Sequence, residues 1–240
     1  MITHAVIFAP IGQISRSDQI VQRLSNAIIT GLLEAHEQLP NEADLARMMG
    51  VSHITIREAL NTLRANNLIH TVRGRNGGSF VCENAATQSD GLHPLGAIGT
   101  DYLADLGEMH CAIISHSARL AARRMMAGDI TRFRECVAIF TTAEAPELRA
   151  QADLRCLLTL AACSHSTRLA SHELQLQTEW AALVADVYRC DEAHREAVDH
   201  YARLVEALDG RDAASAVQTS ASLIETLTSH LIENKLKYNK

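Results

Sequence analysis

The chain has 240 residues, 47% of them hydrophobic, and a formal net charge of −6 at pH 7. This hydrophobic content excludes an intrinsically disordered protein, and the length is sufficient for two modest domains that each bury a core. With only 4% aromatic residues and 4 prolines, helices that pack through aliphatic side chains are favoured.

The apolar runs and the cysteines indicate the compartment of the protein. No apolar stretch approaches the ~20 residues of a membrane span. The N-terminal run from Ile2 to Pro10 lacks the basic residues that begin a signal peptide. The six cysteines are scattered without a Cys-x-x-Cys pair, as expected of free thiols in a reducing compartment. We therefore expect a cytoplasmic protein that does not bind a membrane.

Three helices are predicted in the first third of the chain. Apolar residues recur at helical spacing over residues 15–33, which predicts a first helix. Pro40 and Asn41 open a second helix, with Asn41 as its N-cap, and this helix ends at Gly50. Ser52 is then the N-cap of a third helix, so that two short helices meet at a sharp turn.

The segment from Val51 to Arg64 is the centre of this pattern. At about 100° per residue, its apolar and polar residues occupy different helical faces. The apolar face comprises Ile56, Ala59, Leu60 and Leu63, and the polar face comprises His53, Arg57, Asn61 and Arg64. One face can pack while the other reaches outward, which is typical of the recognition helix of a helix-turn-helix protein.

A hairpin is predicted directly after this helix. Residues 68–72 and 79–81 are expected to form two strands around a glycine-rich turn that carries Arg73 and Arg75. Helices followed by such a hairpin predict a winged helix-turn-helix domain over residues 1–82. Acidic and basic residues balance over residues 1–85, so the basic footprint for DNA is small and local.

The remainder of the chain is predicted to be helical. Residues 83–99 lack sustained periodicity and are expected to form a linker. Residues 100–240 are expected to form an all-α antiparallel bundle. Its helices are predicted at residues 100–127, 129–142, 145–163, 167–190, 191–208 and 212–233. The fold class is therefore mainly α, a winged helix-turn-helix followed by a helical bundle.

The N-terminal domain resembles the GntR family of bacterial transcription regulators. The family pattern is met by Leu39-Pro40-Asn41-Glu42, Leu45, Gly50-Val51-Ser52, Arg57-Glu58-Ala59-Leu60 and Gly77-Gly78. The resemblance implies binding to a double-stranded DNA operator. His53 is a departure, because the family has an arginine there that would contact bases or phosphates.

We expect Arg57 to read a base, and the other contacts to be secondary or to the DNA backbone. The candidate DNA-binding residues are Ser52, His53, Thr55, Arg57, Asn61, Arg64, Arg73, Gly74 and Arg75. The alternative is that the arginines merely solvate an exposed helix face, as surface arginines usually do.

The second domain is similar to the helical effector (FCD-like) domain of the FadR-type branch of that family. The similarity is carried by Glu108-Met109-His110, Ala118-Arg119-Leu120-Ala121-Ala122 and Asp153-Leu154-Arg155-Cys156-Leu157. In many branch members, the matching aspartate and three histidines hold a divalent metal beside a carboxylate effector. Here Asp153 is retained, whereas Leu157, Tyr201 and Leu223 stand at the histidine positions.

We therefore predict that the family metal site is lost and that no metal or other cofactor is bound. An alternative stays open, in which His194 or His200 restores a metal ligand. The resemblance also implies a small-molecule pocket inside the bundle, for a carboxylate or an apolar metabolite. The candidate effector-binding residues are His110, Asp153, His194 and Tyr201.

These patterns predict a ligand-responsive DNA-binding transcription regulator, a repressor that binds a short inverted repeat as a homodimer. A small-molecule effector would release or reposition it. One alternative is a DNA-binding dimer that senses no effector. Another is a metal-dependent helical enzyme, but the sequence contains no His-Glu-x-x-His motif, nucleophile elbow or phosphate-binding loop. We expect no catalytic residues.

Overall fold

The computed structural model describes residues 16–29, 31–72, 74, 77–83, 95 and 98–238. The chain divides into two compact units, one containing residues 16–29 and 33–83 and the other containing residues 98–238. Each unit has a hydrophobic core of its own. The predicted linker, residues 83–99, lies mostly outside the described residues.

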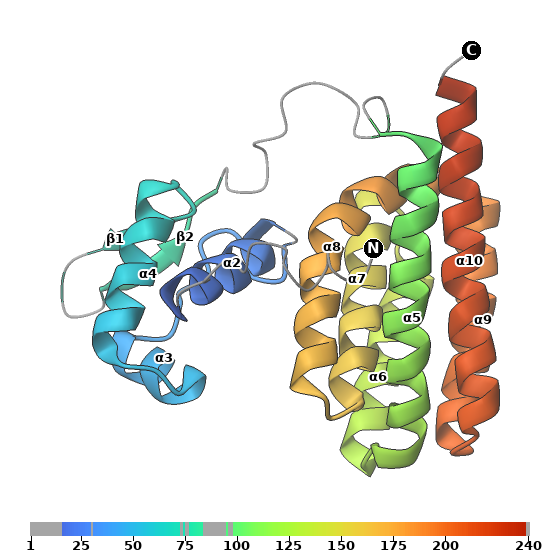
Figure 1. The fold of residues 1–240 in the computed structure, drawn as a ribbon, viewed down its shortest axis with the longest axis horizontal. Coiled ribbons are helices and arrows are strands. Elements are labelled where there is room, and N and C mark those ends of the chain that lie inside the picture. The colour runs from blue at the N-terminus through green and yellow to red at the C-terminus, as the bar shows by residue number, and fades with distance from the viewer. Residues whose placement is uncertain are drawn as a thin grey trace, which may run out of the picture. The chain divides into compact units, whose positions relative to one another are not determined.

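The described residues of the N-terminal unit form three helices and a two-stranded sheet (Figure 1). Its elements are α2 (Arg16–Ile29), α3 (Glu42–Met49), α4 (His53–Ala65), β1 (Ile69–Val72) and β2 (Gly78–Val81). The strands are antiparallel, with Ile69 opposite Val81 and Val72 opposite Gly78. The core of this unit includes Ile20, Leu24, Ile28, Leu45, Ile56, Leu60 and Leu63. This arrangement is the winged helix-turn-helix predicted from the sequence.

Local hydrogen bonds explain the sharp turn between α3 and α4. The side chain of Asn41 accepts a hydrogen bond from the Asp44 backbone N–H at 2.9 Å and caps α3. Gly50 ends α3 with a φ of 64°, a conformation that glycine adopts without steric cost. The Ser52 hydroxyl accepts from the Thr55 N–H at 3.1 Å and starts α4. These three residues therefore set the direction of the recognition helix.

The second unit is a bundle of long helices that lie side by side (Figure 1). Its elements are α5 (Thr100–Arg124), α6 (Ala127–Thr142), α7 (Pro146–Cys163), α8 (Thr167–Val187), α9 (Asp191–Asp209) and α10 (Ala213–Tyr238). Helix α5 packs against α10 and α7, and α7 also packs against α6 and α8. None of the helices in the described part of the chain is long and apolar enough to cross a membrane.

Several predicted helix boundaries need correction, including the ends of the helices predicted at residues 100–127 and 167–190, which end at Arg124 and Val187. The first helix ends at Ile29 instead of residue 33, and Gly31 follows with a φ of 70°. Helix α6 begins at Ala127, ahead of Gly128, because the Asp129 carboxylate accepts a hydrogen bond from the Met126 N–H at 2.9 Å. Helix α10 continues to Tyr238, beyond the predicted end at residue 233.

Candidate DNA-binding surface and effector site

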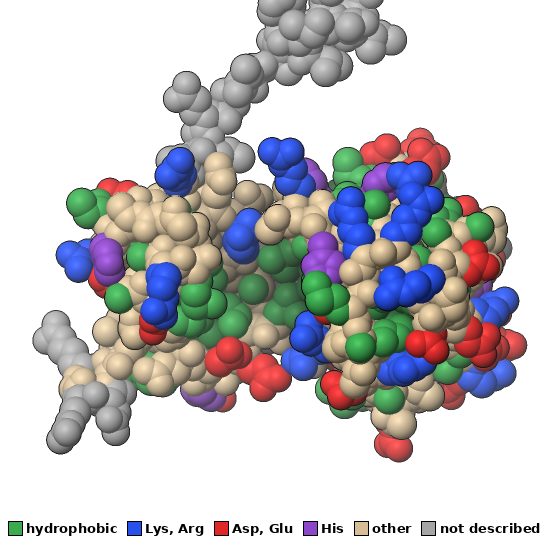
Figure 2. All heavy atoms as spheres, turned by 90° about the horizontal axis from the view of Figure 1, so that it is seen from below, with side chains coloured by type: hydrophobic (Ala, Val, Ile, Leu, Met, Phe, Trp, Pro, Cys, Tyr) green, Lys and Arg blue, Asp and Glu red, His purple; other side chains and the backbone are tan. Residues whose placement is uncertain are grey.

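The outward face of α4 carries the polar residues that the sequence placed there. His53, Arg57 and Asn61 are exposed, Arg64 is half-buried, and the opposite face is buried in the core. In the view of Figure 2, the basic side chains of the N-terminal unit stand apart from one another and do not form one broad patch. A surface of this kind suits local contacts to DNA better than a long electrostatic footprint.

Arg57 is held by an acidic partner on α3. Its Nε and Nη2 atoms donate hydrogen bonds to Oε2 of Glu42 at 3.3 and 3.0 Å. The pair is exposed, so its contribution to stability is small. Its effect is on orientation, because one edge of the guanidinium is fixed and the Nη1–Nη2 edge stays available. That edge can bind O6 and N7 of a guanine together.

Several other polar side chains at the start and end of α4 form hydrogen bonds within the N-terminal unit. Arg64 donates to Oδ1 of Asn61 and, at 3.0 Å, to the hydroxyl of Thr71 on β1. Ser52 and Thr55 share a hydroxyl–hydroxyl hydrogen bond of 2.8 Å at the start of α4. Arg64, which also donates to Asn61, therefore joins the recognition helix to the strand that leads into the wing.

The wing is described only in part. Arg73 and Arg75, the predicted contacts at its tip, lie outside the described residues. Gly74 has a φ of 127°, which side chains rarely allow. A Cβ atom on Gly77 would lie 2.3 Å from the carbonyl oxygen of Val72, so this position also requires glycine.

Two features of this surface were missed by sequence reasoning. Glu42 was assigned to the family motif and to the positive N-terminal end of its helix, but not to the contact that it makes from the first turn of α3 with Arg57 on α4. Ile54 was not considered, although it is 70% exposed at the start of α4. The sequence could have revealed Ile54, because it is an apolar residue among polar residues on the predicted exposed face of the helix.

The bundle interior contains buried polar side chains from several helices. Asp153 on α7 is fully buried and accepts a hydrogen bond of 2.5 Å from the hydroxyl of Tyr201 on α9. His110 on α5 donates to Oε1 of Glu173 on α8 at 3.1 Å. Gln177, one turn further along α8, donates to the same oxygen at 2.6 Å. We call this group the buried polar cluster, which comprises His110, Asp153, Glu173, Gln177, Trp180, Tyr188 and Tyr201.

Six buried atoms of the buried polar cluster have no hydrogen-bond partner. They are Nδ1 of His110, Oδ2 of Asp153, Oε2 of Glu173, Oε1 of Gln177, Nε1 of Trp180 and the hydroxyl oxygen of Tyr188. Leaving such an atom unpaired costs about 1–3 kcal/mol. Unpaired buried groups are scarce in native proteins, and their concentration in one place makes this cluster the candidate effector site.

The pKa shifts show that these groups lie near one another. Burial raises the pKa of Asp153 from 3.8 to about 6, and the Tyr201 hydrogen bond and the charge on His110 oppose this rise. Burial and the nearby Asp153 carboxylate raise the pKa of Tyr188. The Tyr188 hydroxyl also lies close enough to the Asp153 carboxylate for hydrogen bonding between them to lower the pKa of Asp153 and raise that of Tyr188, although the contact does not meet strict hydrogen-bond geometry.

The residues around Asp153 do not fit the metal that the family resemblance implies. Leu157 and Leu223 are buried and apolar, and Tyr201 keeps its proton because burial raises its pKa. A single carboxylate and a neutral phenol are a poor donor set for a divalent transition metal. Within the described residues, no group of three or more His, Cys, Asp or Glu side chains could hold a metal ion.

The other histidines considered as metal ligands bind elsewhere. His194 donates from Nε2 to the carbonyl oxygen of Phe140 at 2.9 Å, and burial lowers its pKa. His200 accepts a hydrogen bond of 3.3 Å from Arg203 at Nδ1. Of the four candidate effector residues, the structure therefore brings His110, Asp153 and Tyr201 into one cluster, whereas His194 binds a backbone carbonyl of α6. Sequence reasoning missed Glu173, Gln177, Trp180 and Tyr188.

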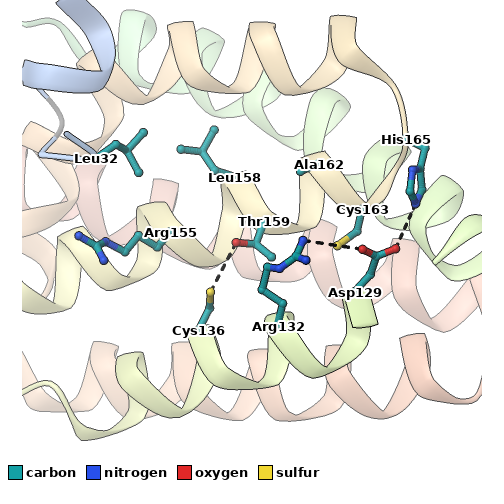
Figure 3. Close-up of a pocket in the computed structure, with 10 residues that line it drawn as sticks. All are labelled: Leu32, Asp129, Arg132, Cys136, Arg155, Leu158, Thr159, Ala162, Cys163 and His165. Carbon is teal, nitrogen blue, oxygen red and sulfur yellow. Dashed lines mark hydrogen bonds and ion pairs between the residues drawn. The ribbon is translucent and has the colours of Figure 1, made fainter. Parts of the chain in front are cut away.

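A surface hollow between α6 and α7 provides a contrast. Figure 3 shows the carboxylate of Asp129 between Arg132 and His165, and Cys136 beside Thr159. The Asp129 carboxylate accepts from the Met126 N–H and from Nε2 of His165 at 3.1 Å. These polar groups satisfy one another, unlike those of the buried polar cluster. The hollow is therefore a weaker candidate for binding an effector.

Comparison with known proteins identifies the family. The gntR family of bacterial regulatory proteins matches residues 16–81, and the FCD domain matches residues 105–226. The chain is 37% identical over 237 residues to RmpR of Mycobacterium gastri, described as an HTH-type transcriptional regulator, covering 96% of this chain and 85% of that protein.

Two further likenesses agree with this result. An Escherichia coli K12 protein described as an L-lactate dehydrogenase operon regulatory protein is 35% identical over 155 residues, covering 62% of this chain and 59% of that protein. The solved structure of E. coli McbR/YncC has the same fold, with a TM-score of 0.54, 18% identity, and coverage of 92% of this chain and 98% of that chain. The chain therefore belongs to the gntR family, as a DNA-binding transcription regulator with an FCD effector-binding domain.

Proposed function

We propose that the protein is a ligand-responsive repressor, whose homodimer binds a short inverted-repeat operator and is released by a small-molecule effector. The observation that carries this proposal is the buried polar cluster with its six unpartnered atoms, in a chain whose other unit presents a recognition helix. Binding of an effector would favour one arrangement of the two protomers over another.

The DNA-binding half of the proposal rests on α4. Arg57, aligned by Glu42, reads a guanine, and Ile54 contacts a thymine methyl group in the major groove. His53, Ser52 and Thr55 contribute secondary contacts, and the wing with Arg73, Gly74 and Arg75 follows the DNA backbone. Asn61 and Arg64 support the helix and contact the backbone at its far end.

The dimer is proposed to form through the bundle. A groove between α5 and α8 is lined by apolar residues, including Leu106, Met109, Ile113 and Leu176. Met109 is 61% exposed in the single chain. Exposed apolar patches of this kind mark protein interfaces. A second copy on this face would hold two recognition helices for successive major grooves.

The alternatives are less well supported. In a dimer that senses no effector, nothing would offset the cost in stability of buried polar atoms that lack hydrogen-bond partners. A metal-dependent enzyme lacks a suitable set of ligands among the described residues. The matching relatives are described as transcription regulators.

Selection from a pool of random DNA duplexes tests the proposal. We expect the full-length protein to enrich an inverted repeat, with half-sites about 10 base pairs apart or a multiple of that spacing. Affinity for the enriched operator should fall steeply as salt is raised. Enrichment of an unrepeated half-site would contradict the dimer, and enrichment of no sequence would contradict the regulator.

Glu42→Gln tests the alignment of Arg57. Removing this negative charge should raise affinity for unrelated DNA. The guanidinium of Arg57, no longer held in one orientation, should discriminate less well between guanine and other bases. We expect the ratio of operator to unrelated affinity to fall roughly threefold to tenfold. Fluorescence anisotropy with the operator and an unrelated duplex measures this ratio.

Glu58→Gln is the control. It removes an exposed charge from α4 but keeps the acidic partner of Arg57, and it should leave the ratio of operator to unrelated affinity unchanged. Equal effects of both variants would refute the alignment.

A further inference from the structure

We propose that the effector is a small amine that also carries a hydroxyl group, and that it binds the buried polar cluster without a metal. This inference rests on the proposed function, because it assigns a ligand class to the sensing site. It differs from the carboxylate or apolar metabolite that the family resemblance implied.

The unpartnered atoms define what the ligand must donate and accept. Oδ2 of Asp153 and Oε2 of Glu173 are carboxyl oxygens and Oε1 of Gln177 is an amide oxygen, so all three can accept hydrogen bonds. An ammonium group donates three hydrogen bonds and accepts none, so it complements such acceptors. Nε1 of Trp180 can only donate and requires an acceptor, which a hydroxyl oxygen supplies. The site therefore calls for more donors than acceptors.

The charge of the buried polar cluster disfavours an anionic ligand. It contains two carboxyl groups, Asp153 and Glu173, against one histidine, His110. The charges that influence the pKa of Asp153 come from His110 and Glu173. A carboxylate brought beside them would be repelled in a medium of low dielectric constant.

Three arginines of the bundle donate to backbone carbonyl groups or to Asp191 and not to the carboxylates of the cluster. Arg149 donates to the carbonyl oxygens of Ala143 and Tyr188 and to Asp191. Arg124 donates to the carbonyl oxygen of Ser164, and Arg211 to that of Met125. Apart from the contact with the Asp191 carboxylate, each of these hydrogen bonds satisfies a carbonyl group at or near the end of a helix.

Trp180 provides a local signal for the experiment. It is the single tryptophan of the chain, it is fully buried, and its ring contacts His110 edge-on with 4.4 Å between ring centroids. Its unpaired Nε1 belongs to the buried polar cluster. Intrinsic fluorescence of the full-length protein therefore reports a ligand that binds there.

Three probes share one carbon skeleton and differ in charge, namely 1-aminopropan-2-ol, propane-1,2-diol and L-lactate. We expect the amine to cause a saturable change in Trp180 emission with a roughly millimolar Kd, as its small size allows. The diol should bind roughly tenfold more weakly, because it lacks the ionic contact. L-Lactate should cause no saturable change.

Asp153→Asn keeps the shape of the side chain and removes its charge. We expect this variant to weaken amine binding roughly tenfold and to change diol binding less than about threefold. Glu173→Gln provides the same test if Asp153→Asn does not fold. Asp199→Asn makes the same chemical change at an exposed position on α9 and should leave binding of the amine unchanged.

The inference is overturned if L-lactate binds as tightly as the amine, if neither neutralising variant weakens the amine, or if no probe changes the emission. Operator selection without any probe separates this failure from that of the proposed function. If the protein still selects its operator but does not bind the amine, only the proposed ligand class is refuted. If the protein selects no operator, the proposed function itself is refuted.

Discussion

Arg57→Ala is expected to lower affinity for the selected operator by about 1–3 kcal/mol, which is roughly fivefold to 150-fold. The variant loses a guanidinium that can bind a guanine with two hydrogen bonds. It also leaves the Glu42 carboxylate, the acceptor of the present ion pair, without its partner beside a negatively charged duplex. Affinity for an unrelated duplex should fall much less, because that binding depends on phosphate contacts alone.

Two comparisons make this result specific to base reading. Arg47→Ala removes an exposed arginine that pairs with Asp44 on α3, and it should change operator affinity less than about threefold. Replacing the critical guanine in the operator should weaken wild-type binding but add little to Arg57→Ala. Equal losses on operator and unrelated DNA would instead assign Arg57 to the phosphate backbone.

The helix-turn-helix could be predicted because its determinants are local. Asn41, Gly50 and Ser52 act on backbone groups within a few residues of themselves, so their effect is visible in a short stretch of sequence. The apolar positions of α4 have helical spacing for the same reason. Helix ends were less predictable. A single capping contact, from the Met126 N–H to Asp129, is enough for α6 to begin at Ala127, before Gly128.

The candidate effector site could be predicted only in part, because its contacts join distant positions. His110 and Glu173 are 63 residues apart, and Asp153 and Tyr201 are 48 apart. Glu173 and Gln177 follow helical spacing, but two polar residues one turn apart usually indicate a solvated face. Their burial depends on how α8 packs against α5 and α7. The pairing of Arg57 with Glu42 was missed for the same reason.

Asp153→Asn is expected to stabilise the protein above about pH 6 and to have little effect near pH 4. Burial raises the pKa of Asp153 from 3.8 to about 6 in the folded protein, and the Asp153 Oδ2 atom lacks a partner. Between these values the folded protein retains a proton that the unfolded chain releases. The contribution of this carboxyl group to the free energy of unfolding therefore falls as pH rises through that window. The loss amounts to about 2–3 kcal/mol once pH exceeds 6.

Asparagine carries no charge and can still accept the hydrogen bond from Tyr201. The variant should therefore unfold about 5–10 °C above the wild type at about pH 8, with the difference vanishing near pH 4. Thermal unfolding followed by Trp180 fluorescence measures this in the bundle, and Asp199→Asn is the exposed control. A variant less stable than the wild type at about pH 8 would show that the ionised carboxylate stabilises the bundle.

The same measurement with ligand connects this stability to sensing. Because 1-aminopropan-2-ol should pair with the ionised Asp153, it is expected to raise the unfolding temperature of the wild type much more than that of Asp153→Asn. The difference between the two proteins should therefore narrow as the amine is added at about pH 8. A carboxylate that lowers stability in the free protein and raises it in the complex is what a site selected for binding requires. Such a residue makes the stability of the bundle depend on whether the effector is bound.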